Sequence, residues 1–383
     1  MNKNTFMALV AICLIGLVGF LVYSRSTQRG DQEAVQIAVN IPLTGPIAAF
    51  SGQYANGLQM GIDDACTEFG INRSIFKVDV QDNAGKPATA VSIMEKQNLR
   101  GFDAYISGTS DMSNAIAKVL DESPAPHLLV SFDAFMTSQG KNRLRILPHY
   151  KIEGPKYVEY AVKRGAKRVF SVTLNNSAIQ EEFDRFVEPE LAKNGIEFKR
   201  EVIDWGFSDY RTIAQKAKDF SPDLIFINGF SVHILPTIQS LRAFDLVEPG
   251  NVLCVMDFID LLYENVDRKE LVDVAFIAPQ FELNTDNKAR NEWQEKYKKR
   301  FGVTPNYVPA FAYDTGYLFV LAYKNARSLT KEKLIEQLPF DGIASRITVD
   351  SEGDFDAGLG IAIVDSDGAV TANIPEPASA NAN

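Results

Sequence analysis

The chain contains few of the residues that carry most metal and redox chemistry. Three cysteines and three histidines occur among its 383 residues. No CxxC pair and no cysteine–histidine spacing typical of a metal site is present, so the sequence predicts neither a metal site nor a cofactor. Cys66, on a predicted helix, and Cys254, in a predicted strand, would allow one disulfide in an oxidising compartment. The favoured interpretation is that both are small buried apolar residues.

Basic charge is also in short supply. Lysine and arginine together number 39 against 49 aspartates and glutamates, which gives a net charge of −10. A protein without a basic surplus gains little from displacing the counterions of nucleic acid, so nucleic acid is excluded as the main partner. The acidic residues are spread along the chain, which indicates a solvated surface rather than an interaction tail.

Motifs of common enzyme classes are absent as well. The sequence has no nucleophile elbow, no HExxH, no Walker A loop and no GxGxxG after a strand. Its histidines lie in different units; His127 is expected in a strand, and His149 is a candidate cleft residue. The stretch DSEGDFDAG at residues 350–358 resembles a calcium loop but lacks the glutamate at the twelfth position, so it predicts a pair of β-turns. We therefore expect a protein that is not an enzyme.

The N-terminus carries the chain's long hydrophobic run. Residues 5–23, from Thr5 to Tyr23, contain no charge and match the roughly 20 residues that span a bilayer. Two interpretations stand: an uncleaved membrane anchor, or a signal peptide cleaved after Ser24. Both predict that the rest of the chain lies outside the cytoplasm, in the periplasm or its equivalent.

Strand and helix patterns alternate from residue 35 onward. Expected strands are VQIAVNIP, FKVDVQ, DAYIS and HLLVS, and helices are expected at 53–69, 87–99 and 113–121. The alternation restarts near Pro148 with a helix that runs from Ile152 to Gly165, followed by RVFSVTL, a helix over AIQEEFDRF, FKREVI, DLIFING and NVLCVM. This pattern predicts an α/β fold with mainly parallel sheets in two successive halves.

The order of these elements predicts two lobes, with the chain passing from one to the other several times. The segment after Phe281 is mostly helical and must cover an existing sheet, and the short final strands need a sheet to join. We expect a leader at 1–30, a first lobe at 34–148 and 279–342, a second lobe at 149–278 and 343–374, and a disordered tail at 375–383. Crossings near Pro148, Ala278 and Gly342 are typical of a hinge.

Several stretches, taken in order, carry a resemblance to a known family. PLTGPIAAFSGQYANGLQMGIDDA is followed by QDNAGKPATAV, ISGTSDMSNAIA, WGFSDYRTIAQKAKDFSPDLIFINGF and EKYKKRFGVTPNYVPAFAYDTGYLFVLA. In order and spacing they resemble the type I periplasmic solute-binding proteins, in particular the branched-chain amino-acid-binding family of ABC transporters, over about residues 35–370. The resemblance implies two Rossmann-like lobes, joined by a three-strand hinge, that close on a ligand.

The resemblance also implies positions for the ligand. Amino-acid-binding members hold the ligand's carboxylate with hydroxyls and backbone amides of the first lobe, and its ammonium with acidic residues. Here Met112 stands where a serine is usual, and Tyr150 stands at an acidic position, so we expect a more apolar and aromatic cleft. The expected ligand-binding residues are Phe50, Ser110, Met112, Ser113, Phe132, Asp133, Phe135, Tyr150, Phe230, Asp257 and Phe258.

The sequence thus predicts an extracytoplasmic solute-binding protein. Its ligand would be a small organic molecule, amino-acid-like or an apolar or aromatic carboxylate. It would deliver that ligand to an ABC permease and its ATPase in the inner membrane. The alternative is a ligand sensor of the same fold, tethered through residues 5–23, that signals to a receptor or kinase.

Overall fold

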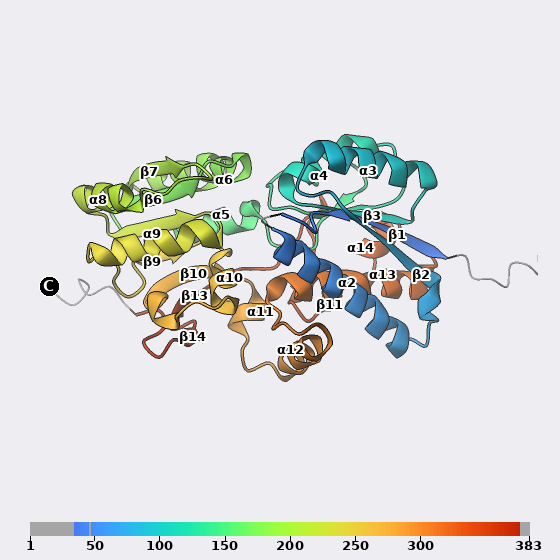
Figure 1. Cartoon of the computed structure of the whole chain (residues 1–383). Helices are drawn as coiled ribbons and strands as arrows, with labels where there is room; N and C mark the ends of the chain where they lie inside the picture. Colours follow the sequence, from blue (N-terminus) through green and yellow to red (C-terminus); the bar gives the residue numbers. More distant parts are fainter. Residues whose placement is uncertain (1–33, 46, 376–383) are drawn as a thin grey trace, which may run out of the picture.

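The computed structural model describes residues 34–45 and 47–375, which form two α/β lobes lying side by side (Figure 1). The first lobe contains a five-stranded sheet in the order β2-β1-β3-β4-β5, and its pairings are parallel. Its strands are β1 Val35–Ile41, β2 Phe76–Asp82, β3 Ala104–Gly108, β4 His127–Val130 and β5 Arg143–Leu144. The predicted α/β fold with mainly parallel sheets is confirmed.

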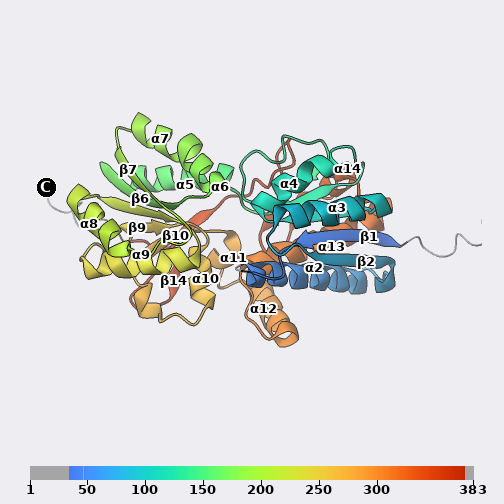
Figure 2. The same cartoon turned by 45° about the horizontal axis from the view of Figure 1, so that its top comes forward.

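Helices cover both faces of this first sheet (Figure 2). α3 Pro87–Arg100 and α4 Ser110–Leu120 pack on one face, and α2 Ala48–Glu68 and α13 Tyr307–Ala326 pack on the other. α3 begins at Pro87, because the fixed φ of proline suits the first helical position. Gly101 follows its last residue as the C-cap, and its φ of 71° terminates the helix.

The long helices α2 and α13 approach each other so closely that only glycine fits at their contact. A Cβ atom on Gly57 would lie 2.2 Å from the carbonyl oxygen of Pro309, and one on Gly61 would lie 2.0 Å from that of Tyr313. α12 Lys288–Phe301 is joined to α2 by an ion pair of 2.6 Å between Lys296 and Asp64. The helical segment after Phe281 therefore packs on the first lobe, although it is distant from that lobe in sequence.

The second lobe contains a seven-stranded sheet in the order β14-β13-β10-β9-β8-β6-β7. The pairings among β6 to β10 are parallel, and β13 runs antiparallel to β10. Its strands are β6 Arg168–Leu174, β7 Glu197–Ile203, β8 Leu224–Asn228, β9 Val252–Cys254, β10 Val274–Ala278, β13 Gly360–Val364 and β14 Val370–Thr371. Its helices are α5 Tyr150–Lys163, α6 Ser177–Glu182, α7 Glu188–Lys193, α8 Tyr210–Phe220, α9 Ser231–Ala243 and α10 Phe258–Tyr263.

Three stretches of chain join the lobes: β5 to α5, β10 to α11 Gln280–Leu283, and the segment that leads into β13. Arg145 on the first stretch forms an ion pair of 2.7 Å with Asp354 on the third, and both side chains are fully buried. Nε2 of His149 lies 2.7 Å from the carbonyl oxygen of Phe355. The three-strand hinge that the resemblance implied is present, and His149 belongs to it rather than to the cleft.

Some elements differ from the sequence-based expectation. α4 begins at Ser110 rather than at 113, and α5 begins at Tyr150 rather than at 152, because the polar first turns carry no apolar periodicity. The helix expected over AIQEEFDRF is divided, since α6 ends at Glu182 and the π-helical turn η3 Phe183–Val187 follows. The stretch DSEGDFDAG forms turns as predicted. Its first residue, Asp350, forms an ion pair with Lys151 of α5, with 3.1 Å between Nζ and Oδ2.

The cysteines Cys66 and Cys254 are buried and free, one in each lobe, which confirms their interpretation as small apolar residues. The expected anchor or signal peptide at residues 5–23 lies outside the described residues. In the part of the chain that the structure describes, no helix combines the length and apolar character needed to cross a bilayer. The expected lobe boundaries stay a prediction. Just after the boundary expected at residue 342, Ile343 donates its backbone N–H to Asp314 of α13.

Candidate ligand-binding cleft

The candidate site lies where the carboxyl ends of strands from both sheets meet between the lobes. β3 leads into α4 at Ser110, and β4 ends just before Phe132. In the second lobe β8 ends shortly before Phe230, and β9 leads to Asp257 at the start of α10. Ligands of open α/β sheets bind at such ends, because loops and helix N-termini converge there.

Two cavities lie between the lobes. One of about 430 Å³ is lined by Asn114, Asp133 and Phe135 from the first lobe and by Ser177, Gln180 and Arg185 from the second. The other, of about 300 Å³, is lined by Phe50 and Gln53 of α2, by Asp260 and Tyr263 of α10 and by Glu264, which follows α10. Each cavity has walls from both lobes, so a molecule bound in either contacts both.

A row of aromatic side chains begins on the first lobe and continues to Tyr150 at the start of α5 in the second lobe. The ring centroids of Phe50 and Phe132 are 6.4 Å apart, and those of Phe132 and Tyr150 are 5.9 Å apart. Phe135 reaches across to the second lobe, where its ring stacks on Phe186 at 5.9 Å and lies 4.7 Å from the guanidinium of Arg185. Of the expected aromatic residues, Phe50 and Phe135 line the two cavities, and Phe132 and Tyr150 continue the row that begins at Phe50.

An aromatic stack at the carboxyl ends of β7 and β8 includes one residue not expected from the sequence. Phe230 is half-buried and stacks on Trp205, with ring centroids 5.0 Å apart. Trp205 is 52% exposed and follows the end of β7. Trp205 opens the stretch WGFSDYRTIAQ. A lone tryptophan just after a strand end was the sequence feature that could have identified it as a candidate site residue.

Polar groups of the first lobe are largely engaged with one another. The Ser110 hydroxyl accepts the backbone N–H of Phe132 at 3.2 Å and the hydroxyl of Ser131 at 3.1 Å. The Asp133 carboxylate accepts a hydrogen bond from the Asn114 amide. Burial raises the pKa of Asp133, and its Oδ1 atom has no hydrogen-bond partner. Asp133 therefore presents one unpartnered acceptor oxygen on this wall, in a cavity that Asn114 and Arg185 also line.

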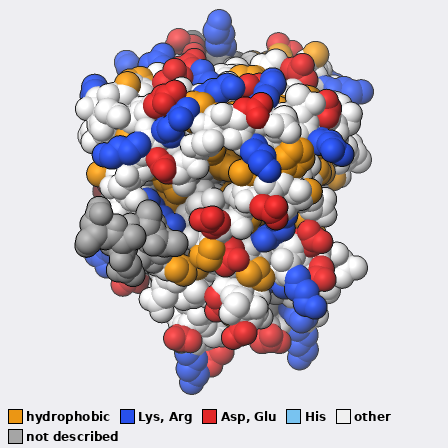
Figure 3. All heavy atoms as spheres, turned by 90° about the vertical axis from the view of Figure 1, so that its left-hand side faces the viewer, with side chains coloured by type: hydrophobic (Ala, Val, Ile, Leu, Met, Phe, Trp, Pro, Cys, Tyr) orange, Lys and Arg blue, Asp and Glu red, His pale blue; other side chains and the backbone are white. Residues whose placement is uncertain are grey.

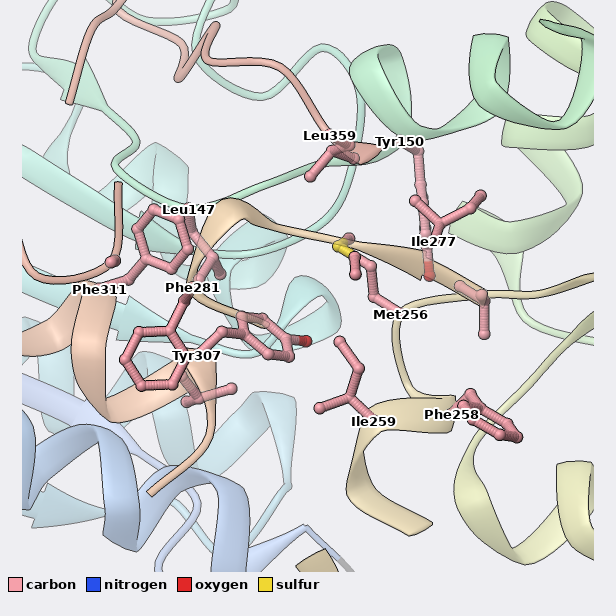
Figure 4. Close-up of a cluster of buried hydrophobic side chains, with 14 of the residues drawn as sticks. Leu147, Tyr150, Met256, Phe258, Ile259, Ile277, Phe281, Tyr307, Phe311 and Leu359 are labelled. Atoms are coloured by element: carbon pink, nitrogen blue, oxygen red, sulfur yellow. The ribbon is translucent and has the colours of Figure 1, made fainter. Parts of the chain in front are cut away.

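Three expected site residues lie in the core instead. Met112 packs among the apolar side chains between α3, α4 and the sheet, and Ser113 is hydrogen-bonded at 2.8 Å to Ser107. Phe258 is fully buried and stacks on Phe276 of β10 at 4.8 Å. Figure 4 shows Ile259, not Phe258, directed towards Tyr307. The resemblance implied cleft positions for all three, but each helical step turns a side chain by about 100°, and the direction in which these side chains pack cannot be inferred from their order along the chain.

Asp257 stands at the start of α10, beside further buried carboxyl groups. Burial, with a contribution from the charge of Asp260, raises the pKa of Asp257 to about 8. The charge of Asp257 acts in turn on two further acids, Glu153 of α5 and Glu182 of α6, both fully buried. We call Glu153 and Glu182 the buried acid pair. Sequence reasoning missed them, because a glutamate on an amphipathic helix normally faces solvent.

The buried acid pair is held by uncharged donors. The backbone N–H of Met256 donates to Oε1 of Glu153 at 3.0 Å, and the Asn228 amide donates to Oε2 of Glu182 at 2.6 Å. Burial is the largest cause of a rise in the pKa of Glu153 to about 8, and the charge of Asp257 adds to it. Burial and the charge of Glu153 also raise the pKa of Glu182 well above its usual value.

Comparison with known proteins assigns the chain to a family. A family model described as periplasmic binding protein matches residues 34–369. The chain belongs to the periplasmic binding protein family. A curated relative, a Leu/Ile/Val-binding protein of Rhizobium johnstonii, is 24% identical over 202 residues; that match spans 51% of this chain and 54% of the relative, about half the length of each.

Solved members of the fold superpose over most of this periplasmic binding protein. A leucine-binding protein of Thermotoga maritima has a TM-score of 0.72 at 23% identity and covers 89% of this chain and 98% of its own. A branched-chain amino acid transporter substrate-binding protein of Streptococcus pneumoniae, in complex with isoleucine, has a TM-score of 0.74 at 18% identity and covers 90% and 100%. A solute-binding protein of Rhodopseudomonas palustris, in complex with 3,4-dihydroxybenzoic acid, has a TM-score of 0.75 at 18% identity and covers 90% and 99%. These similarities confirm the type I periplasmic binding protein fold.

The surface of the second lobe agrees with the charge analysis. In the end-on view of this lobe, basic and acidic side chains are intermixed and neither sign gathers into a stripe (Figure 3). A basic stripe is the electrostatic footprint of nucleic-acid binding. The viewed face of this periplasmic binding protein therefore lacks that footprint.

Proposed function

We propose that the protein is an extracytoplasmic solute-binding protein that captures a small organic ligand by closing its two lobes. The ligand would then pass to an ABC permease driven by an ATPase in the inner membrane. The observation that carries this proposal is the cleft itself: two cavities with walls from both lobes, at the carboxyl ends of both sheets, above a three-strand hinge. Closure can be driven only by the ligand's greater affinity for the closed state.

The proposed contact residues are mainly aromatic. They are the row Phe50, Phe132 and Tyr150 and the stacked pair Phe230 and Trp205. Rigid aromatic side chains supply large contact areas at a small cost in conformational entropy. The remaining proposed contacts are Ser110, Asp133, Phe135 and Asp257. We propose no catalytic role for any of them.

The class of ligand has two candidates in the similar structures, an amino acid such as isoleucine and an aromatic carboxylate such as 3,4-dihydroxybenzoic acid. The aromatic walls suit the apolar part of either. The polar groups decide between charged classes, and the larger cavity offers both kinds, since Asp133 lies on its wall together with the donors Asn114 and Arg185.

The alternative function is a tethered sensor of the same fold. The uncharged run at residues 5–23 supports it, because an uncleaved run of this length would hold the protein at the membrane. N-terminal sequencing of the exported protein separates the two. A mature N-terminus at residue 25 supports a released binding protein, and an intact residue 1 supports the tethered form.

The proposed function is tested by the molecule that the purified protein retains. The protein is denatured after extensive washing, and the released small molecules are identified by mass spectrometry and titrated back into refolded protein by calorimetry. We expect one organic molecule at close to one per chain that rebinds. A protein that retains nothing, and binds no organic solute from a broad panel, would contradict the proposal.

A further inference from the structure

The two lobes contact each other through side chains at two separate places along the cleft. At one, η3 follows α6 and carries Arg185 and Phe186, which reach Phe135 of the first lobe. At the other, Asp260 of α10 meets Asn306, the residue before α13. At the junction between the lobes, α6 lies above α10 (Figure 1). We call the first contact the aromatic bridge and the second the amide bridge.

The aromatic bridge joins the ring of Phe135 to two neighbouring residues of η3. The ring stacks on Phe186, with centroids 5.9 Å apart and an angle of 27° between the planes. The guanidinium of Arg185 lies 4.7 Å from the Phe135 centroid, and an ion pair of 3.1 Å with Glu181 orients it. Stacked aromatic pairs, and cations over aromatic faces, attract beyond the area that they bury. Two attractions therefore join the lobes at one ring.

The position of η3 depends on Gly154 of α5. A Cβ atom on Gly154 would lie 2.7 Å from the Cβ of Phe186 and 3.3 Å from the Cγ of Glu182. A side chain at this position would push η3 away from α5. π-helical turns are rare and occur frequently at functional sites. The close packing on α5 fixes the backbone that carries Phe186.

The amide bridge uses both polar atoms of one side chain. Oδ1 of Asn306 accepts the backbone N–H of Val308 at 3.0 Å and so caps α13, while Nδ2 donates to Oδ1 of Asp260 at 3.0 Å. Asn306 is 4% exposed. A hydrogen bond to a carboxylate is stronger than one between neutral groups. Because the cap fixes the orientation of the amide, its donor is already directed at the second lobe.

Each bridge borders one of the two cavities. Phe135 and Arg185 line the larger cavity, and Asp260 and Asn306 line the smaller one. Both partners of each bridge belong to the protein, so the bridges form when the lobes close, with or without a bound molecule. Separation of the lobes breaks both. The closed arrangement therefore has contacts of its own that the open one lacks.

Contacts of this kind shift the equilibrium between open and closed lobes. A hydrogen bond to a charged group changes an equilibrium constant about tenfold or more, and a stacked aromatic pair changes it about threefold to tenfold. A protein binds its ligand with an apparent affinity proportional to the fraction of molecules in the competent state. Contacts that favour closure thus raise the affinity for every solute by the same factor.

We propose that the aromatic bridge and the amide bridge form a latch that holds part of the ligand-free protein closed. This inference rests on the proposed function, since closure is what captures the solute. A ligand shifts the mixture of open and closed molecules by its greater affinity for the closed form. The latch sets the ratio from which that shift starts.

Two substitutions break the bridges without altering the row of Phe50, Phe132 and Tyr150. Asn306→Asp keeps the cap on α13, because aspartate caps a helix as well as asparagine does, but it sets a second carboxylate against the one across the cleft. Phe186→Ala removes the stacked ring.

The matched controls make the same two changes away from the cleft contacts. Asn287→Asp alters the N-cap of α12, whose side chain accepts the backbone N–H of Arg290 in its own helix. Phe220→Ala removes a half-buried ring at the end of α8, which packs on Phe170 in its own lobe.

Small-angle scattering of ligand-free protein measures the mixture. The protein is unfolded, dialysed to remove retained molecules and refolded, and circular dichroism checks that each variant has folded. We expect each bridge substitution to lower the ratio of closed to open molecules about fivefold or more. The double variant of Asn306→Asp and Phe186→Ala should therefore have a larger radius of gyration than the wild type, and the double control should match the wild type.

Equal radii of gyration for the wild type and the double variant would overturn the latch, as would an equal increase in the double control. If the double variant does not fold, each single variant is compared with its own control, and the same order is expected. The measurement uses no solute, so failure of the latch leaves the proposed function standing, because a ligand alone can drive closure. A protein that binds no solute would refute the proposed function whatever the scattering shows.

Discussion

The substitution Glu153→Gln should make the protein more stable at high pH and leave it little changed at low pH. The pKa of Glu153 is raised from 4.5 to about 8, chiefly by burial. The folded protein therefore holds a proton between pH 4.5 and 8 that the unfolded chain releases. Since the folded state binds more protons over this window, stability falls as pH rises through it. A glutamine has no such proton to lose.

The magnitude follows from the size of the shift. One pKa unit corresponds to about 1.4 kcal/mol, so a shift of 3.5 units sets a ceiling of about 5 kcal/mol for the free-energy difference across the window. Part of this free energy belongs to Glu182, because burial and the charge of Glu153 raise its pKa as well. We therefore expect the variant to exceed the wild type by about 2 kcal/mol or more at pH 8, and to match it at pH 5.

The assay is urea unfolding of ligand-free protein at pH 5, 6, 7 and 8, with Glu159→Gln measured alongside. Glu159 lies on the same helix but is exposed, so its variant corrects for the loss of one surface charge. The reasoning is refuted if the difference between Glu153→Gln and wild type is the same at pH 5 and pH 8, or if the variant is less stable at both.

Two further substitutions test the hinge and the cleft. Asp354→Asn leaves Arg145 buried without its partner and should cost about 3–5 kcal/mol in urea unfolding at pH 7; a loss no larger than that of the exposed control Asp356→Asn would contradict this role. Phe230→Ala should weaken ligand binding by about 2 kcal/mol, whereas Phe258→Ala should mainly lower stability, by about 3–5 kcal/mol, because its ring is core. Equal affinity of Phe230→Ala and wild type would remove Phe230 from the site.

Much of the fold was predictable because local patterns and global architecture agree. The strand FKVDVQ was recognised from its alternating pattern, the buried strand RVFSVTL from its apolar residues, and Pro87 marked the start of α3. Helix starts at Ser110 and Tyr150 were missed, since first turns that face a cleft carry polar residues. The π-helical turn after Glu182 leaves no periodic signature that distinguishes it from a continuous helix.

The site was predictable only in part, because facing directions are decided by packing. Phe50 lines a cavity, as expected from its place near the start of α2. Met112 and Phe258 turn into the core instead. The buried acid pair was invisible in the sequence, because Glu153 and Glu182 become neighbours only when α5 and α6 pack together.

Small-angle scattering with and without a saturating ligand tests the central claim, capture by lobe closure, most directly. The ligand is the molecule recovered from the protein or, failing that, whichever solute of the panel binds most tightly in calorimetry. The account predicts a smaller radius of gyration and a shorter maximum dimension in the bound form, since the two lobes approach about the three-strand hinge. An unchanged radius of gyration at full occupancy would contradict it.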